Sequence, residues 1–349
     1  MNHQPPARNA AHSAAGGSTT NHPLFLKRNR RIFEEELDDF LPDKVLDFHT
    51  HVFPAGSVSD GEMYSCAGYP IPKYDFDDLK RELADVYPGR ETSAVCFGMP
   101  QIPYDRALNN RYIAENSDNT RFFGLHLFDP KNDDPNELRS QLAESPLRGL
   151  KPYWRYANDD PESVGIHDML PSWAMEIVND LGLIVMLHIS KKGRLADADN
   201  QREIVELCER YPKARIVLAH VGRAYFLKNI TGNIEPLKDI PNLWFDLAMV
   251  SNPDVLEYLF RAVDPAKIIY GTDMPIAVAP GKSRDTGDGY TYVTPVTWEL
   301  SVCEEGEYTS FLYEELLGIK EAVRRLGRDD EFLAHIFYEN GMRLLGPTD

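Results

Sequence analysis

The sequence predicts an α/β fold, a closed (β/α)8 barrel of the TIM type, and three observations support this. Short apolar runs alternate with longer amphipathic runs through most of the 349 residues. The short runs are apolar on both faces, which is typical of parallel strands covered by helices. Eight such strand–helix units fit a closed barrel better than an open sheet.

The expected elements follow one another in a regular order. Strands are expected near residues 45–49, 93–98, 122–128, 148–153, 183–189, 215–220, 242–247 and 267–272. Helices are expected at residues 75–87, 106–118, 134–144, 168–181, 200–211, 253–263, 310–327 and 329–344. The segment 224–240 predicts a shorter helix, and 31–42 predicts an acidic helix ahead of the first strand.

Three segments fall outside this alternation. Residues 1–22 are polar and aperiodic, and we expect a disordered tail there, followed by a single barrel domain at residues 23–349. Long loops at 52–74 and 274–309 follow the first and the eighth strand. Barrel enzymes build their pockets from loops at these strand ends, so we expect both to be substrate walls or lids.

Composition excludes some classes of function. The net charge is −18, from 55 acidic and 37 basic residues, which argues against a nucleic-acid partner. No apolar stretch has the length of a membrane span, and no signal peptide is expected. The cysteines form no C-x-x-C pair, which argues against disulfides or a cysteine zinc site and favours the cytoplasm; they are Cys66, Cys96, Cys208 and Cys303.

Five side chains at strand ends indicate a metal site. The first expected strand reads VLDFHTH, and because strand side chains alternate, His49 and His51 project to one side. His188, His220 and Asp273 end three later apolar runs. A single buried histidine is more often a hydrogen-bonded core residue. Strand ends of a barrel converge on one rim, however, and imidazole with carboxylate suits a divalent transition metal.

These motifs carry a resemblance to a known family. DFHTHVFP, the two later histidines and GTDMP resemble the amidohydrolase superfamily. The closing YENGMRLLG resembles its amidohydrolase-related (type 2) branch, which includes enzymes like aminocarboxymuconate-semialdehyde decarboxylase. The resemblance spans about residues 44–346.

The resemblance implies a mononuclear metal centre. His49, His51, His188 and Asp273 would hold one divalent ion, and His220 would lie beside the reacting water or substrate. Asp273 and His220 are therefore the expected catalytic residues. Zinc is expected, with manganese as the alternative, because such sites accept several first-row ions.

Lys151 has three interpretations. Binuclear members of the superfamily carry a carboxylated lysine near this point of the fourth strand. An uncarboxylated Lys151 would instead bind an anionic group of the substrate, and we favour this because the rest of the chain resembles the mononuclear branch. A structural role, with the ammonium group in solvent, is the third.

Other residues after the strand ends suggest a carboxylate-bearing substrate. Arginine binds a carboxylate with two parallel hydrogen bonds. The expected substrate-binding residues are Lys151, Arg155, Tyr153 and Arg223, with Lys191 and Arg194 as further cations. Each of these cations could equally be solvated. Asp47 and Asp246 either orient a ligand or satisfy a buried polar network.

Four functions compete. The favoured one is a metal-dependent hydrolase of a small amide, ester or lactone, with a decarboxylase or hydratase of an unsaturated or aromatic acid as the alternative. A TatD-like phosphodiesterase is disfavoured by the net charge of −18 and by Lys151. A non-enzymatic barrel leaves the ligand-type residues unexplained. The expected partner is a small anionic molecule, and a homodimer remains open.

Overall fold

The computed structural model describes residues 23–59, 65–66, 69–295, 301–304 and 309–346. The tail expected at residues 1–22 lies outside this part of the chain.

Eight parallel strands form the barrel, and their spatial order follows their order in the chain. They are β1 (Lys44–His51), β4 (Glu91–Phe97), β5 (Phe122–Phe128), β6 (Leu147–Pro152), β7 (Ile184–Leu187), β8 (Arg215–Leu218), β9 (Leu243–Asp246) and β10 (Ile268–Ile269). Residues after β10 close the barrel onto β1, because Phe48 N donates to Tyr270 O (3.0 Å) and His51 N to Met274 O (2.7 Å). The predicted fold class is confirmed.

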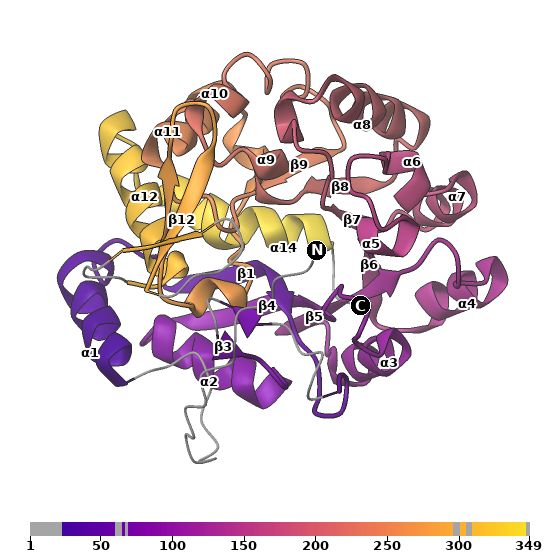
Figure 1. Ribbon diagram of the computed structural model, residues 1–349, viewed down its shortest axis with the longest axis horizontal. Helices are drawn as coiled ribbons and strands as arrows, with labels where there is room; N and C mark the ends of the chain where they lie inside the picture. The colour runs from indigo at the N-terminus through magenta and orange to yellow at the C-terminus, as the bar shows by residue number, and fades with distance from the viewer. Residues whose placement is uncertain (1–22, 60–64, 67–68, 296–300, 305–308, 347–349) are drawn as a thin grey trace.

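Helices surround the strands (Figure 1). The main ones are α2 (Phe76–Val86), α3 (Arg106–Asn116), α4 (Pro135–Glu144), α7 (Ser172–Leu181), α8 (Ala198–Arg210), α11 (Pro253–Ala262) and α12 (Phe311–Leu326). All of these except α7 begin after a side chain that accepts a hydrogen bond from the first helical turn, and these N-caps are Asp75, Asp105, Asp134, Asp197, Asn252 and Ser310.

Several helices differ from expectation for local reasons. The helix expected at 168–181 is divided at Pro171 into α6 (Ile166–Met169) and α7, since proline cannot donate within a helix. Segment 224–240 holds only α10 (Leu227–Ile230). The acidic helix starts earlier, as α1 (Pro23–Ile32) with the π-helix η1 (Phe33–Leu37). The terminal helix consists of α13 (Asp330–Ala334), the π-helix η5 (His335–Glu339) and α14 (Asn340–Leu345).

Short elements complete the described fold. They are β2 (Ser65–Cys66), β3 (Tyr69–Pro70), α5 (Trp154–Ala157), η2 (Arg194–Ala196), α9 (His220–Arg223), η3 (Pro265–Lys267), η4 (Ile276–Val278), β11 (Lys282–Asp285), β12 (Tyr290–Thr294) and β13 (Ser301–Cys303).

We call the end of the barrel that carries His49 and His51 the upper end, and the opposite one the lower end. The interior at the lower end is apolar and is closed by the C-terminal helix. Leu344 and Leu345 of α14 belong to the same buried cluster as Leu46 and Phe48 of β1. Gly341 permits this approach, since a Cβ there would lie 2.7 Å from a Leu46 methyl carbon. The cluster also includes the strand residues Val95, Phe97, Phe123, Leu125, Ile184, Met186, Val217 and Ile269, and Ala219 directly after β8.

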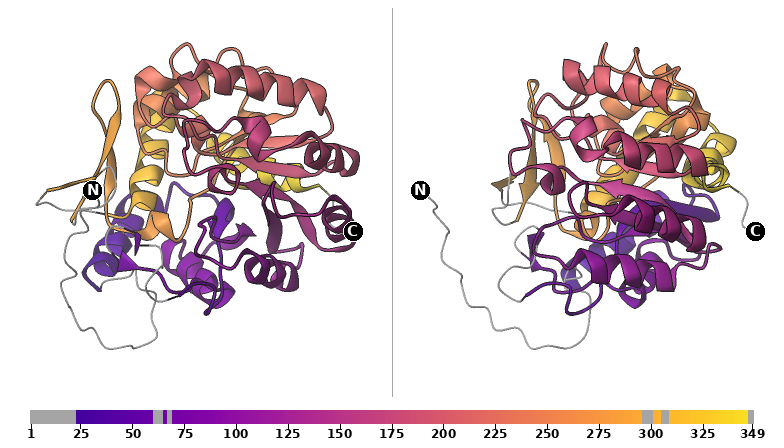
Figure 2. Two further views of the ribbon diagram at one scale, coloured as in Figure 1. Left: turned by 45° about the vertical axis from the view of Figure 1, so that its right-hand side comes forward. Right: turned by 90° about the vertical axis from the view of Figure 1, so that its right-hand side faces the viewer.

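The opposite end is covered in part by the long segment after β10. β11 and β12 form an antiparallel hairpin, and β13 joins β12 in parallel. Asp285 Oδ2 fixes the hairpin over the barrel loops, because it accepts from Leu227 N and from Asn252 Nδ2 (3.1 Å each). Figure 2 shows the hairpin and the C-terminal helix at opposite ends of the barrel. Parts of both long loops, at 60–64, 67–68, 296–300 and 305–308, lie outside the described residues.

None of the helices that the structure describes combines the length and the apolarity needed to cross a bilayer.

Candidate metal centre

Three histidine rings at the upper end of the barrel are held in one tautomer. His51 Nδ1 lies 3.0 Å from Gly98 O and His220 Nδ1 lies 2.8 Å from Ala248 O. A carbonyl oxygen only accepts, so Nδ1 carries the proton in both rings. His49 Nδ1 donates in the same way to Asp246 Oδ2 at 2.7 Å.

The other nitrogens of these rings face one carboxylate. Asp273 Oδ1 lies 3.0 Å from His51 Nε2 and 3.5 Å from His49 Nε2, and Asp273 Oδ2 lies 4.0 Å from His220 Nε2. Burial lowers the pKa of His49 and His220, which keeps both rings neutral. Their Nε2 atoms therefore carry no proton and face carboxylate oxygens, and that of His49 also accepts from Lys151 Nζ at 3.4 Å.

This arrangement fits a divalent cation. Asp273 Oδ1 is buried and accepts no hydrogen bond from any described residue. The pKa of the Asp273 carboxyl lies below its usual range in spite of burial, so the carboxylate is ionised. Converging lone pairs repel one another unless a positive ion lies between them, and nitrogen with carboxylate oxygen is a donor set that zinc and similar ions accept.

Asp273 reaches this position from a loop rather than from a strand. β10 ends at Ile269, and the chain then holds Asp273 at a positive φ of 74°. Asp273 N donates to His49 O at 2.8 Å, which ties the carboxylate to the β1 histidines.

Asp246 belongs to a second group of possible ligands with His49 and His220. The 2.7 Å separation of Asp246 Oδ2 from His49 Nδ1 is that of a hydrogen bond. Two ligands of one tetrahedral ion, each about 2.0 Å from it, would lie about 3.3 Å apart. Asp246 therefore orients His49, and burial raises the pKa of its carboxyl to about 6.

Asp47 supports the same histidine from below. It accepts from His49 N (3.0 Å), Thr272 N (2.9 Å) and Thr272 Oγ1 (2.5 Å). Burial raises the pKa of Asp47 to about 7, against the effect of these hydrogen bonds. The carboxyl thus joins β1 to the segment that carries Asp273.

His188 lies beside this group but not within its tightest set. It follows β7, and its ring centroid is 5.3 Å from that of His220 and 5.2 Å from that of Tyr153. In the described residues the compact group is His49, His51 and Asp273, and it does not include His188. His188 Nδ1 is buried and has no hydrogen-bond partner among these residues, unlike the other three rings.

Lys151 is a cation beside His49. Its Nζ lies 3.4 Å from His49 Nε2 and 4.7 Å from the centre of the Phe97 ring, and the side chain is buried. Burial lowers the pKa of Lys151 to about 8, although Asp273 and Asp246 favour its charged form. The structural interpretation, with the ammonium in solvent, is therefore wrong.

The other predicted substrate cations are placed differently. Arg223 Nη1 donates to Ser190 O (2.5 Å) and to Ile189 O (3.4 Å), which holds its guanidinium beside the segment that follows β7. Lys191 is paired with Asp199 at 2.9 Å, and Arg155 is exposed over the Trp154 ring at 4.9 Å. Lys191 and Arg155 are therefore poorly placed to bind an anion at the histidines.

His220 and Arg223 are positioned by an unusual turn. The φ angles of His220, Val221, Gly222 and Arg223 are 56°, 51°, 65° and 63°, and Ala224 N donates to His220 O at 3.2 Å. The backbone therefore makes one left-handed turn. L-residues adopt this conformation at a cost of roughly 1–2 kcal/mol each.

An aromatic wall, which the sequence did not predict, extends from the histidines to the hairpin. The Tyr225 ring lies 6.0 Å from the His220 ring and 4.7 Å from that of Tyr290 on β12. The Arg194 guanidinium covers Tyr290 at 4.8 Å, and Arg194 Nε is buried with no described hydrogen-bond partner. The tyrosine-rich YTY of the hairpin was the only signal in the sequence.

The amidohydrolase family model matches residues 46–346, which is most of the chain. The chain belongs to the amidohydrolase family. This is a family of metal-dependent enzymes that act on small molecules, and the His and Asp groups described above could hold the metal. No curated protein matches the sequence significantly.

Solved structures share the fold at low sequence identity. An amidohydrolase from Burkholderia multivorans with bound zinc has a TM-score of 0.55 at 11% identity, over 86% of this chain and 98% of that one. A probable 2-pyrone-4,6-dicarboxylic acid hydrolase from Acinetobacter baumannii, with citric acid bound, gives 0.53 at 16% identity, over 86% and 99%. The 4-oxalomesaconate hydratase of Rhodopseudomonas palustris gives 0.54 at 16% identity, over 86% and 95%.

Proposed function

We propose that this amidohydrolase is a hydrolase that uses one divalent metal, zinc or alternatively manganese, on a small carboxylate-bearing amide, ester or lactone. The observation that carries the proposal is the convergence of histidine Nε2 atoms on the Asp273 carboxylate. A metal bound there supplies a Lewis acid that polarises a substrate oxygen and acidifies water.

We assign the ligands as His49, His51, Asp273 and His188. The first three already form the compact group. His188 is assigned as the fourth because its buried Nδ1 has no hydrogen-bond partner among the described residues and is therefore open to an ion. His220 therefore remains to orient the reacting group, with its neutral Nε2 turned to the site.

The residues around the centre have distinct proposed roles. Asp273, ionised in the folded protein, accepts the proton of the attacking water. Lys151 and Arg223 bind the substrate carboxylate. Tyr153, whose ring lies beside that of His188, contacts the rest of the substrate. Arg155, which the sequence suggested for the same purpose, is left as a solvent-facing residue of the outer rim.

A lyase of the aminocarboxymuconate-semialdehyde decarboxylase-like branch is the second candidate. Decarboxylation or hydration needs the same ligand set and the same carboxylate-binding cations, so Lys151 serves both. Product analysis separates the two: carbon dioxide or a hydrated acid from an unsaturated substrate identifies the lyase, and two fragments from a lactone or amide identify the hydrolase.

Metal analysis of purified protein is the first experiment. We expect close to one equivalent of zinc or manganese, and loss of that metal from folded His49→Ala and His188→Ala variants. His335→Ala is the matched control, because His335 lies in η5 and pairs with Glu339 at 3.1 Å. Two equivalents per chain, or metal retained in both histidine variants, would contradict the assignment.

A further inference from the structure

A cavity lies on the outer side of the barrel, away from the candidate metal centre. It has a volume of about 510 Å³ and lies between α3 and α4, against β5. Phe123 and Leu125 of β5 point into the barrel interior, so His126, next along the strand, faces outward to this cavity. We call it the α3–α4 pocket.

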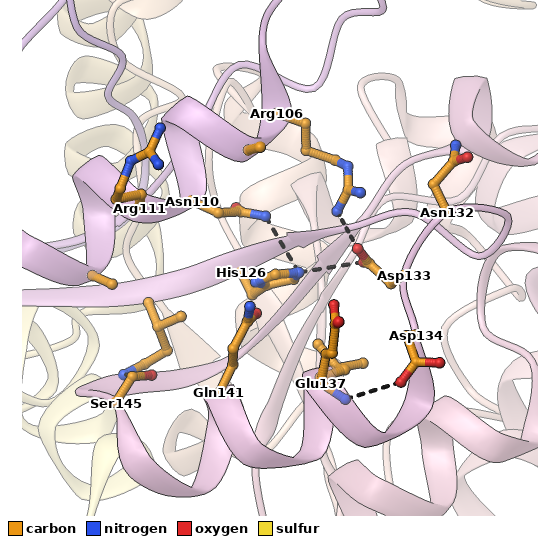
Figure 3. A pocket seen from close by; sticks show the side chains of 14 residues that line it. Arg106, Asn110, Arg111, His126, Asn132, Asp133, Asp134, Glu137, Gln141 and Ser145 are labelled. Atoms are coloured by element: carbon orange, nitrogen blue, oxygen red, sulfur yellow. Dashed lines mark hydrogen bonds and ion pairs between the residues drawn. The ribbon is translucent and has the colours of Figure 1, made fainter.

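His126 is at the centre of the pocket and has one nitrogen without a partner (Figure 3). The residue is 4% exposed, and its Nε2 lies 3.3 Å from Asp133 Oδ2. Asn110 Nδ2, which is a donor, lies at the same distance of 3.3 Å from this nitrogen, so both neighbours of Nε2 belong to the pocket lining. The Nδ1 atom is buried and receives no hydrogen bond from any described residue.

Charged side chains of both signs line the two walls of the pocket. Arg106 on the α3 side is bound to Asp133 at 2.5 Å. Arg111 of α3 and Glu137 of α4 also line the pocket, and neither side chain forms an ion pair with a described residue. Figure 3 shows Glu137 extending from α4 toward His126, with Arg111 on the opposite wall. One cation and one anion thus face a shared space.

The remaining lining is apolar and gives the pocket a place for a hydrocarbon group. Ala107 and Ala114 come from α3, Leu138 comes from α4 and Leu147 comes from β6. Leu138 and Leu147 are buried beneath the charged rim. The volume is within the range of about 300–1,000 Å³ that small-molecule sites occupy.

We propose that the α3–α4 pocket binds a small aliphatic zwitterion, a free α-amino acid. Its carboxylate pairs with the guanidinium of Arg111. Its ammonium donates to Glu137, and its side chain covers Leu138 and Leu147. The site lies behind β5 and contains none of the proposed metal ligands, so binding there does not require the metal.

Calorimetry with full-length protein tests the proposal. L-leucine is titrated to about 10 mM, together with L-leucinamide, which lacks the carboxylate, and N-acetyl-L-leucine, which lacks the cation. We expect leucine to bind with a Kd of about 1 mM or lower, and each analogue to bind at least about ten-fold more weakly. No heat from leucine, or equal affinity for all three compounds, overturns the proposal.

Variants locate the binding. Arg111→Met and Glu137→Gln should each weaken leucine binding about ten-fold, which is a loss of one of the two ion pairs. Lys131→Met and Glu115→Gln change exposed residues of the same charges outside the lining, and should leave the affinity unchanged. The metal-site variant His51→Ala should bind leucine as wild type does. Unchanged affinity in both lining variants would contradict the site.

Discussion

The two ends of the barrel interior differ in polarity. At the lower end, side chains from the strands and from α14 form a buried apolar cluster that includes Phe48 and Leu344. At the upper end, His49, Asp246 and Lys151 are equally buried but polar. The layers touch, because the Phe97 ring lies 5.1 Å from that of His49.

The contrast separates stability from chemistry. Burying an apolar side chain contributes roughly 1.5–3 kcal/mol to folding. Burying a polar group costs free energy unless hydrogen bonds replace its water, and Nδ1 of His49, His51 and His220 each has such a partner. Apolar burial in the lower layer stabilises the barrel. It offsets the free-energy cost of burying the polar side chains of the upper layer.

The largest expected effect is on turnover, from Asp273→Asn. The change keeps the size of the side chain but removes the proton acceptor and a charged ligand, so kcat should fall by about 10³-fold or more. Steady-state kinetics at full metal loading measures it, with circular dichroism as the check on folding. Turnover within a few-fold of wild type would mean that Asp273 is not the acceptor.

Phe48→Ala should show the reverse pattern. Removal of a ring from the lower layer leaves a cavity and should lower the free energy of unfolding by about 3–5 kcal/mol, as large aromatic deletions do. Urea denaturation measures this loss. The kcat per bound metal should stay near wild type, and a parallel collapse of activity in the folded variant would show that the two layers are not separable.

Lys151→Met tests how the upper layer recognises substrate. The variant keeps the aliphatic stem and deletes the charge that lies over the Phe97 ring, so KM for an anionic substrate should rise about ten-fold, or about 1.4 kcal/mol. Lys192→Met, at an exposed position after β7, is the control. An unchanged KM, or a neutral preferred substrate, would remove Lys151 from substrate binding.

The smallest effect concerns Glu315 of α12, buried behind the upper layer. Burial raises its pKa well above 4.5, and Oε2 accepts from Met249 N at 2.8 Å. The folded state therefore holds this proton more tightly than the unfolded state, so the contribution of Glu315 to stability is full below about pH 4.5 and is lost as pH rises toward the folded pKa.

Glu315→Gln should remove that dependence. The amide oxygen still accepts from Met249 N, and no charge is buried at any pH. The variant should match wild type near pH 4.5 and exceed it at pH 7–8 by about 1 kcal/mol or more, since one pKa unit is about 1.4 kcal/mol. Denaturation curves at both pH values decide this, and a constant difference would contradict the titration of Glu315.

The barrel could be predicted from the sequence because the hydrophobic patterns of its strands and helices lie within short stretches of the chain. Strands apolar on both faces and amphipathic helices are visible in short windows, and the β1 histidines follow from strand alternation. The sequence could not show that Asp273 lies beyond β10, nor that His188 adjoins His220 rather than the β1 pair. Those relations depend on backbone angles and on contacts between distant segments.

The cations show the same limit. Lys191 and Arg223 look alike as charged residues after strand ends, yet Lys191 is paired with Asp199. Arg194 gains its place on the aromatic wall from Tyr290, almost a hundred residues later in the chain. The sequence shows which side chains are charged, but the fold decides which groups they pair with.

The left-handed turn at His220 to Arg223 has a consequence for the chirality of the chain. Three of its residues are not glycine, so the cost of positive φ is roughly 3–6 kcal/mol if it adds. At Gly222, an added Cβ would meet Leu195 and Leu218 side-chain carbons at 3.0 Å, so an L-side chain there is both strained and crowded. For a D-amino acid, these torsion angles are the relaxed ones. D-valine can be placed at position 221 by chemical ligation. The unfolded peptide would then already favour the left-handed backbone conformation at this position, which L-valine adopts only in the folded barrel.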